Sequence, residues 1–193
     1  MSILTTEQDT EFVTFDKIPR LSRDCVITEK IDGTNAQILI TVDGTLYAGS
    51  RSRWIVTPDV PIEDDNHGFG RWALDHKEEL IVGLGIGRHF GEWWGAGIQR
   101  RYGMKEKRFS LFNTSVWSDE AVRPKCCGVV PVLYQGPFDT VLIDDCMNRL
   151  KREGSLAAPG FMNPEGIVIY HTAARQYFKK TIEKDESPKG VQS

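Results

Sequence analysis

Lys30 lies where a β-branched segment meets a tight turn, and a lysine in that position can play two different roles. The segment "ITEKIDGTNAQILITV" begins at Ile27, and its Asp32-Gly33 pair is typical of a turn between two strands. Lys30 is therefore either a solvated turn residue or a nucleophile displayed at the end of a strand. An unperturbed lysine has a pKa of ~10.4, so only about a thousandth of such amines is neutral near pH 7. A nucleophilic lysine therefore needs neighbouring cations or desolvation that disfavour its charge.

Several other polar side chains interrupt apolar, strand-like runs. Glu92 lies in "HFGEWWG", where an unpaired carboxylate would be costly to bury, and Glu165 precedes a glycine in "NPEGIVIY". Polar groups at strand ends that face one cleft are what a nucleotide and its phosphates require. The residues with these properties are Ser50, Arg51, Glu92, Asn113, Glu165, Lys179 and Lys180.

The elements that must position these side chains are mostly strands. Alternating apolar residues predict strands over 26–30 and 35–42, with a hairpin turn at Asp43-Gly44. Two helices are predicted, one over 68–80 and one that begins near Asp139 or Thr140 and ends at Gly154. Further strands are predicted over 88–94, 108–117 and 128–136, followed by a strand, a turn and a strand over 166–183.

This order of elements predicts an α+β fold, with antiparallel β-sheets flanked by helices. No repeat or linker divides the chain, so we expect a single domain over residues 1–193, with a frayed polar tail over 183–193. No apolar run approaches the ~20 residues that span a bilayer, and the N-terminus does not resemble a signal peptide. We therefore expect a cytoplasmic protein without membrane contact.

Charge and cysteine content narrow the function classes further. A net charge of −3 argues against bulk binding of nucleic acid, although "RRYGMKEKR" from Arg100 to Arg108 holds five cations and one acid. The cysteines at 25, 126, 127 and 146 fit neither a disulfide framework nor a zinc site, so we expect reduced thiols.

In order and character, these residues resemble the motifs of the covalent nucleotidyltransferase superfamily of ligases and mRNA capping enzymes. The resemblance is closest to the nick-sealing, ATP-dependent RNA ligases, and it runs from about residue 25 to 182. The stretch from Lys30 to Asn35, "KIDGTN", resembles their nucleophile motif. DNA ligases and capping enzymes usually carry an arginine where this chain has Asn35. The resemblance implies a nucleotidyltransferase domain, similar in outline to ATP-grasp folds.

The resemblance also implies roles for single residues in a pocket for ATP. Lys30 would attack the α-phosphate and hold AMP, with Glu29 and Ile31 beside it, and Asp32 would shape the catalytic turn. Glu92 would accept a hydrogen bond from the ribose; alternatively, it is a structural carboxylate paired with Arg88 or Arg100. Phe112 would stack on adenine, although an isolated aromatic residue is more often part of a core.

Further roles concern phosphates, metal and nucleic acid. Glu165 would engage Mg²⁺ or Mn²⁺, and Lys179 would contact the α-phosphate. Lys180 is the alternative, but successive strand residues point to opposite faces, so only one lysine should enter the site. Arg51 would contact a phosphate, with Arg53 as the alternative. Asn35 would act when the 3′-hydroxyl attacks, and basic side chains would follow the nucleic-acid backbone: Arg100, Arg101, Lys105, Lys107 and Arg108.

Together these implications describe an ATP-dependent polynucleotide ligase. It would join 5′-phosphate and 3′-hydroxyl ends of nicked or single-stranded RNA or DNA through a lysyl-AMP intermediate, with no obligate protein partner. Larger relatives carry a further domain after the last motif, whereas this chain stops soon after it, so we expect a minimal form. The alternatives are a DNA nick-sealing ligase, a guanylyltransferase, a nucleic-acid end-binding module with weak turnover, and an α+β protein of unrelated function.

Overall fold

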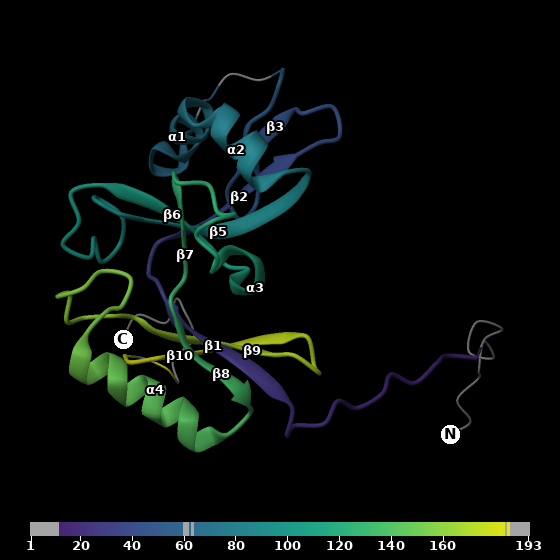
Figure 1. The fold of residues 1–193 in the computed structure, drawn as a ribbon, viewed down its shortest axis with the longest axis vertical. Coiled ribbons are helices and arrows are strands. Elements are labelled where there is room, and N and C mark those ends of the chain that lie inside the picture. Colours follow the sequence, from purple (N-terminus) through teal and green to yellow (C-terminus); the bar gives the residue numbers. More distant parts are fainter. Residues whose placement is uncertain (1–11, 60–61, 63, 184, 186–193) are drawn as a thin grey trace, which may run out of the picture.

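Two β-sheets, one above the other in Figure 1, form the body of the protein in a computed structural model that describes residues 12–59, 62, 64–183 and 185. The four-stranded sheet has the order β10 (Gln176–Thr181), β9 (Gly166–His171), β1 (Asp24–Lys30) and β8 (Val132–Pro137). The six-stranded sheet has the order β4 (Trp54–Val56), β3 (Leu46–Gly49), β2 (Thr34–Ile40), β5 (Gly87–Gly95), β6 (Lys107–Leu111) and β7 (Cys127–Val129). All neighbouring strands pair antiparallel except β6 and β7, which pair in parallel. The predicted α+β fold with antiparallel sheets is confirmed.

Each sheet buries one face against helices. In the six-stranded sheet, Ile38 and Trp93 pack with Phe69 of α1 (Phe69–Asp75) and Leu80 of α2 (Lys77–Leu84). In the four-stranded sheet, Ile27 packs against α4 (Thr140–Glu153). Burial of these apolar faces removes them from water and supplies the main stabilising term.

Helix α4 forms as its sequence predicts. The side chain of Asp139 accepts a hydrogen bond from the backbone N–H of Val141 at 2.8 Å and so caps the helix. The helix ends at Gly154, whose φ of 82° is costly for residues with a side chain.

The chain passes from one sheet to the other directly after Lys30. β1 belongs to the four-stranded sheet and β2 to the six-stranded sheet, so residues 31–33 form the junction between them. A third apolar cluster fills this junction: Ile31, Trp94, Tyr102, Val130 and Ala158. The predicted nucleophile motif therefore connects the two layers of the fold.

Three predicted elements differ from the structure. The helix predicted over 68–80 is two helices, α1 and α2, which meet at His76, and a short 3₁₀ turn (Asn66–Gly68) precedes them. The strand predicted over 108–117 ends at Leu111, because Asn113 turns the chain into the short helix α3 (Thr114–Trp117). The hairpin predicted at Asp43-Gly44 is confirmed, with Gly44 at a φ of 79°.

The third difference is the strand predicted over 128–136, which is two strands in different sheets. β7 pairs with β6, and β8 pairs with β1, with Pro131 between them. Proline has no N–H to donate, but its carbonyl oxygen accepts a hydrogen bond from the backbone N–H of Glu29 at 2.9 Å. The predicted frayed tail, residues 183–193, lies largely outside the described residues.

Candidate active site at the junction of the two sheets

Lys30 and Glu165 form an ion pair at the end of the four-stranded sheet. The Lys30 Nζ atom lies 2.5 Å from Glu165 Oε2, although the two residues are 135 positions apart in the sequence. Lys30 is the last residue of β1 and pairs with Gly166 of β9, so the β1–β9 register places Glu165 beside the amine. The Lys30 side chain is only 20% exposed, which argues against a freely solvated turn residue.

The turn after Lys30 is held by side chains from distant parts of the chain. The backbone N–H of Asp32 donates to the Tyr102 hydroxyl at 2.8 Å, and Arg100 Nε donates to Asp32 Oδ2 at 3.1 Å. Gly33 donates its N–H to Glu92 Oε1 at 3.0 Å. These contacts fix the position of the Lys30 backbone relative to the six-stranded sheet.

Gly33 is required here because of close packing, not because of its backbone conformation. The φ of Gly33 is not positive, so other residues could adopt its backbone conformation. A Cβ atom at this position, however, would collide with the carbonyl oxygen of Trp93 and would lie 2.7 Å from Trp94 Cβ. Close approach of the turn to β5 is therefore what excludes a side chain.

Glu92 lies across the junction from Lys30. It stands opposite Asn35 in the β2–β5 pairing, and Asn35 Nδ2 donates to Glu92 Oε2 at 3.4 Å. Burial raises the pKa of Glu92 to about 7; Lys30 and the Gly33 N–H lower it, and Glu165 and Asp32 raise it. Glu92 is thus buried beside Lys30 with its ionisation balanced near neutral pH.

Neither arginine considered as a structural partner for Glu92 contacts it. Arg88 donates to the Gln37 side chain and lies over the Trp54 ring at 5.1 Å. Arg100 pairs with Asp32 and also donates to the carbonyl oxygen of Asn163 at 3.3 Å. Arg100 is therefore engaged inside the junction rather than displayed for a nucleic-acid backbone.

The register of the four-stranded sheet separates Lys179 from Lys180. Lys179 of β10 pairs with Val168 of β9, which pairs with Thr28 of β1, two residues before Lys30. Directly paired residues share a face of a sheet, so Lys179 lies on the face of Lys30.

Lys180 lies on the opposite face, where its Nζ atom contacts Asp144 Oδ1 of α4 at 2.7 Å. The resemblance implied a nucleotide contact for Lys180 as well, but this lysine is paired with Asp144 of α4 instead. Glu29 is on this face too. Its buried carboxylate accepts hydrogen bonds from Ser155 Oγ at 2.5 Å and from the N–H groups of Leu156 and Ala157 at 2.7 and 2.9 Å. The Glu29 side chain was expected beside the nucleotide and instead holds the loop after α4.

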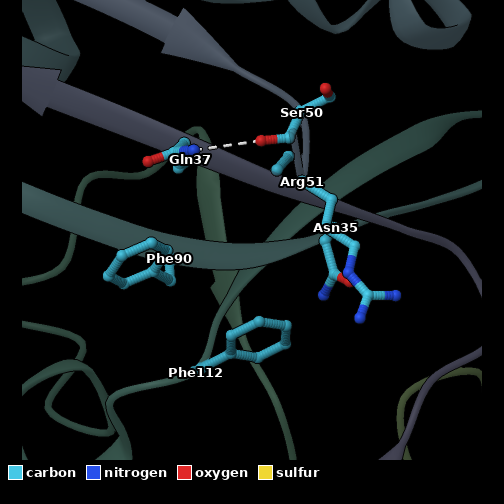
Figure 2. Close-up of a pocket in the computed structure, with 7 residues that line it drawn as sticks. Asn35, Gln37, Ser50, Arg51, Phe90 and Phe112 are labelled. Atoms are coloured by element: carbon cyan, nitrogen blue, oxygen red, sulfur yellow. Dashed lines mark hydrogen bonds between the residues drawn. The ribbon is translucent and has the colours of Figure 1, made fainter. Parts of the chain in front are cut away.

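A cavity of 150 Å³ opens on the junction-facing side of the six-stranded sheet. Figure 2 shows its polar and aromatic lining, and Phe112 there is 36% exposed rather than part of a core. The lining residues are Asn35, Ala36, Gln37, Ser50, Arg51, Phe90 and Phe112. Arg51 reaches this cavity, whereas the guanidinium of Arg53 donates to the carbonyl oxygen of Asp64 at 2.9 Å.

The remaining basic residues do not form one stripe. Lys107 Nζ donates to the carbonyl oxygen of His67 at 2.6 Å, and Arg101 lies in an exposed turn with a φ of 58°. Lys105 and Lys107 line a separate, open cavity of 470 Å³ together with Arg71 and Trp72, apart from Arg100 in the junction. The composition of residues 100–108 therefore did not predict their arrangement.

Tyr102 is a site residue that the sequence interpretation missed. Its hydroxyl accepts from the Asp32 N–H, and burial holds the pKa of this hydroxyl well above its ordinary value. The sequence offered one signal for Tyr102. It is the single aromatic residue in the basic stretch from Arg100 to Arg108, and an aromatic ring among charged residues indicates burial.

The carboxylates of the junction suit a metal ion carried by phosphates better than a protein-built metal site. Among the described residues, no cluster of three His, Cys, Asp or Glu side chains could hold a metal ion. Mg²⁺ usually takes one or two protein carboxylates and completes its shell with phosphate oxygens and water. Glu165, whose buried carboxylate faces Lys30, fits that requirement.

Comparison with solved structures places the fold in a defined class. The chain is similar to a mutant of Naegleria gruberi RNA ligase solved with ATP and Mn, with 16% identity and a TM-score of 0.58 over 84% of this chain and 51% of that one. Two further mutants of that ligase, solved with AMP and Mn, show 16% and 17% identity with TM-scores of 0.57 and 0.58, over 82% and 83% of this chain and 49% and 50% of theirs. The chain thus spans about half the length of these structures and shares their fold.

The family itself follows from the sequence match. The family model described as RNA ligase matches residues 23–184, most of the chain. The chain belongs to the RNA ligase family. None of the curated proteins compared with it matches. Within the described residues, no helix has the length and apolar character needed to cross a membrane.

Proposed function

We propose that the protein is an ATP-dependent polynucleotide ligase that joins 5′-phosphate and 3′-hydroxyl ends through a covalent lysyl-AMP intermediate. The observation that carries this proposal is the Lys30 amine, 2.5 Å from Glu165 in a largely enclosed junction, with Glu92 beside it. Membership of the RNA ligase family supports RNA on at least one side of the joint.

In the first step, the Lys30 nitrogen attacks the α-phosphorus of ATP. A nitrogen–phosphorus bond forms, the bond from the α-phosphorus to the bridging oxygen breaks, and pyrophosphate leaves. The ammonium form must first lose a proton, and Glu165 Oε2 is positioned to accept it. Lys179, on the same face of the sheet, would offset negative charge on the phosphoryl group in flight.

The remaining site residues would hold the nucleotide. Glu92 Oε2 would accept a hydrogen bond from the ribose, and the exposed ring of Phe112 would stack on adenine. A divalent cation, Mg²⁺ or Mn²⁺, would be held by Glu165 and would neutralise charge on the phosphates when bound.

The second and third steps involve the polynucleotide. AMP passes from Lys30 to the 5′-phosphate, and the 3′-hydroxyl then attacks that phosphate and releases AMP. Asn35 and Arg51 line the cavity next to Glu92 and would contact the 5′-phosphate end. We propose nicked or single-stranded ends as substrates and one catalytic domain in this chain. The four free cysteines support a reducing location such as the cytoplasm.

Transfer of labelled AMP to the protein tests the proposal. After incubation with α-labelled ATP and Mg²⁺, the wild type should form an acid-labile protein–AMP adduct, and Lys30→Ala should form none. Lys151→Ala, which removes an exposed lysine of α4, is the matched control and should label like the wild type.

Other labelling results would select other functions. An adduct that persists in Lys30→Ala would contradict the assignment of the nucleophile. Labelling from GTP alone would indicate capping chemistry, and no adduct with any nucleoside triphosphate would favour an end-binding module. Nicked duplexes with RNA or DNA on either side of the break would then define the substrate.

A further inference from the structure

Phe90 is an exposed aromatic residue in the candidate site that the proposed cycle does not use. It lies on β5 two residues before Glu92, so both side chains face the junction. Phe90 is 52% exposed, which is unusual for a large apolar residue on a central strand. A function that covers the ring would explain its exposure.

Phe90 and Phe112 form a pair of rings in one cavity. The Phe112 N–H donates to the Phe90 carbonyl oxygen at 2.9 Å, which fixes the two residues side by side. Both rings line the 150 Å³ cavity, and in Figure 2 Phe90 lies farthest from Asn35 and Arg51, with Phe112 between them. The proposed cycle assigns one of the two rings, Phe112, to the adenine of ATP, so the Phe90 ring is left for another base.

The position of Phe90 relative to Lys30 favours a base that does not belong to ATP. On the face of the sheet that Phe90 shares with Glu92, Asn35 and Glu92 form the strand pair nearest the Lys30 turn, and Gln37 and Phe90 form the next pair along the strands. Two residues along a strand correspond to about 7 Å. Phe90 therefore lies farther from the Lys30 turn than Glu92, whose carboxylate accepts the Gly33 N–H.

A phosphate-binding group shares the cavity with Phe90. Arg51 lines it and forms no salt bridge with any residue that the structure describes. Gln37 closes one side, because its Nε2 atom donates to the carbonyl oxygen of Ser50 at 3.0 Å. An aromatic ring, a free guanidinium and the Asn35 amide together match a nucleotide with its base on the ring and its phosphate on the arginine.

We propose that Phe90 is a stacking platform for the base of the polynucleotide's 5′-phosphate-bearing terminal nucleotide, with Arg51 at its phosphate. The inference rests on the proposed ligase function and adds an acceptor-nucleotide subsite to it. Stacking on a phenylalanine tolerates every base, so the subsite orders the end without selecting its sequence.

The test separates polynucleotide binding from ATP chemistry. Phe90→Ala should label with α-labelled ATP at a rate within about 2-fold of the wild type, which also shows that it folds. Its KM for sealing a pre-adenylylated 5′ end should rise by between about 5- and 150-fold, the range for loss of one base stack. Phe90→Trp should restore wild-type KM. Phe178→Ala, an equally exposed phenylalanine on the face of the four-stranded sheet opposite Lys30, is the matched control.

Two further measurements identify stacking on that particular base. An abasic 5′-terminal nucleotide should weaken binding to the wild type by the same factor as Phe90→Ala, and combining the two changes should cost no more. The salt dependence of binding should be unchanged in Phe90→Ala, because the ring carries no charge, whereas the log–log slope in Arg51→Ala should fall by about 1.

Each contrary result overturns the proposal. Slower lysine adenylylation in Phe90→Ala would assign the ring to the adenine of ATP, and unchanged sealing would mean that nothing stacks on it. Additive losses with the abasic end, or losses only with an abasic 3′-terminal nucleotide, would exclude the proposed base. A wild type that seals no ends and forms no adduct would instead refute the ligase function itself.

Discussion

Glu29 and Glu92 are both buried carboxylates, but they lie in regions with different supplies of hydrogen-bond donors. Glu29, behind the four-stranded sheet, accepts from the Ser155 hydroxyl and two backbone N–H groups. Glu92, at the junction, accepts from one backbone N–H and the more distant Asn35 amide, and it shares the site with Lys30. A fully satisfied carboxylate stabilises structure, whereas an incompletely satisfied one remains available to a ligand.

The two faces of the four-stranded sheet repeat this contrast. Ile27 and Glu29 are buried against α4 and its following loop, whereas Thr28 and Lys30 are half-buried on the opposite face. One face therefore maintains the fold, and the other presents the reacting amine. The predictions below separate these contributions.

The largest effect is expected for Glu165, because its partner is the proposed nucleophile. Glu165→Gln removes the proton acceptor from Lys30 Nζ, and the rate of lysine adenylylation should fall by about 10²- to 10⁴-fold. Rapid-quench measurement with labelled ATP checks this. A rate within a factor of about three of the wild type would show that the ion pair has no chemical role.

The next largest effects are expected when Glu29 and Glu92 are each replaced by alanine, because one substitution should reduce stability and the other activity. Glu29→Ala leaves the Leu156 and Ala157 N–H groups without an acceptor, and the free energy of unfolding should fall by roughly 3 kcal/mol. Glu92→Ala should cost about 1 kcal/mol or less at pH 8 but should abolish most AMP transfer. Urea unfolding and adduct formation measure the two quantities. The reverse pattern would contradict the division of roles.

The pH dependence of stability sharpens the assignment of Glu92. Burial raises the folded-state pKa of Glu92 from an ordinary value of 4.5 to about 7, so the folded protein binds the proton more tightly than the unfolded chain. Its stabilising contribution is complete below pH 4.5 and disappears as the pH rises to 7. It amounts to at most about 3 kcal/mol. Glu92→Gln should flatten this part of the stability curve, and an identical curve in the variant would exclude Glu92 as its source.

The smallest structural effect is expected for the neighbouring lysines of β10. Lys179→Ala should slow lysine adenylylation by about 10- to 100-fold, because Lys179 shares the face of Lys30. Lys180→Ala removes a mostly exposed pair with Asp144 and should reduce stability by roughly 0.5 kcal/mol or less, without slowing adenylylation. Equal losses of activity in both variants would mean that the register does not separate them.

Much of the fold was predictable because local patterns decide it. The cap at Asp139 and the glycine at 154 define α4, and the Asp43-Gly44 pair defines a hairpin. The strand over 128–136 was less predictable, since alternation of apolar residues identifies a strand but not the sheet that it joins. Pro131 marked the break, but only the pairing partners revealed two strands.

The sequence by itself determined the order of the polar motifs, the turn after Lys30 and the opposite orientation of Lys179 and Lys180, because these depend on neighbouring residues. Only the tertiary structure decided that Lys30 meets Glu165, that Arg100 and Tyr102 hold the Asp32 turn, and that Glu29 faces away from the site. The partners in these contacts are separated by 68 to 135 positions. Their meeting depends on how the two sheets pair and pack, which no local pattern encodes.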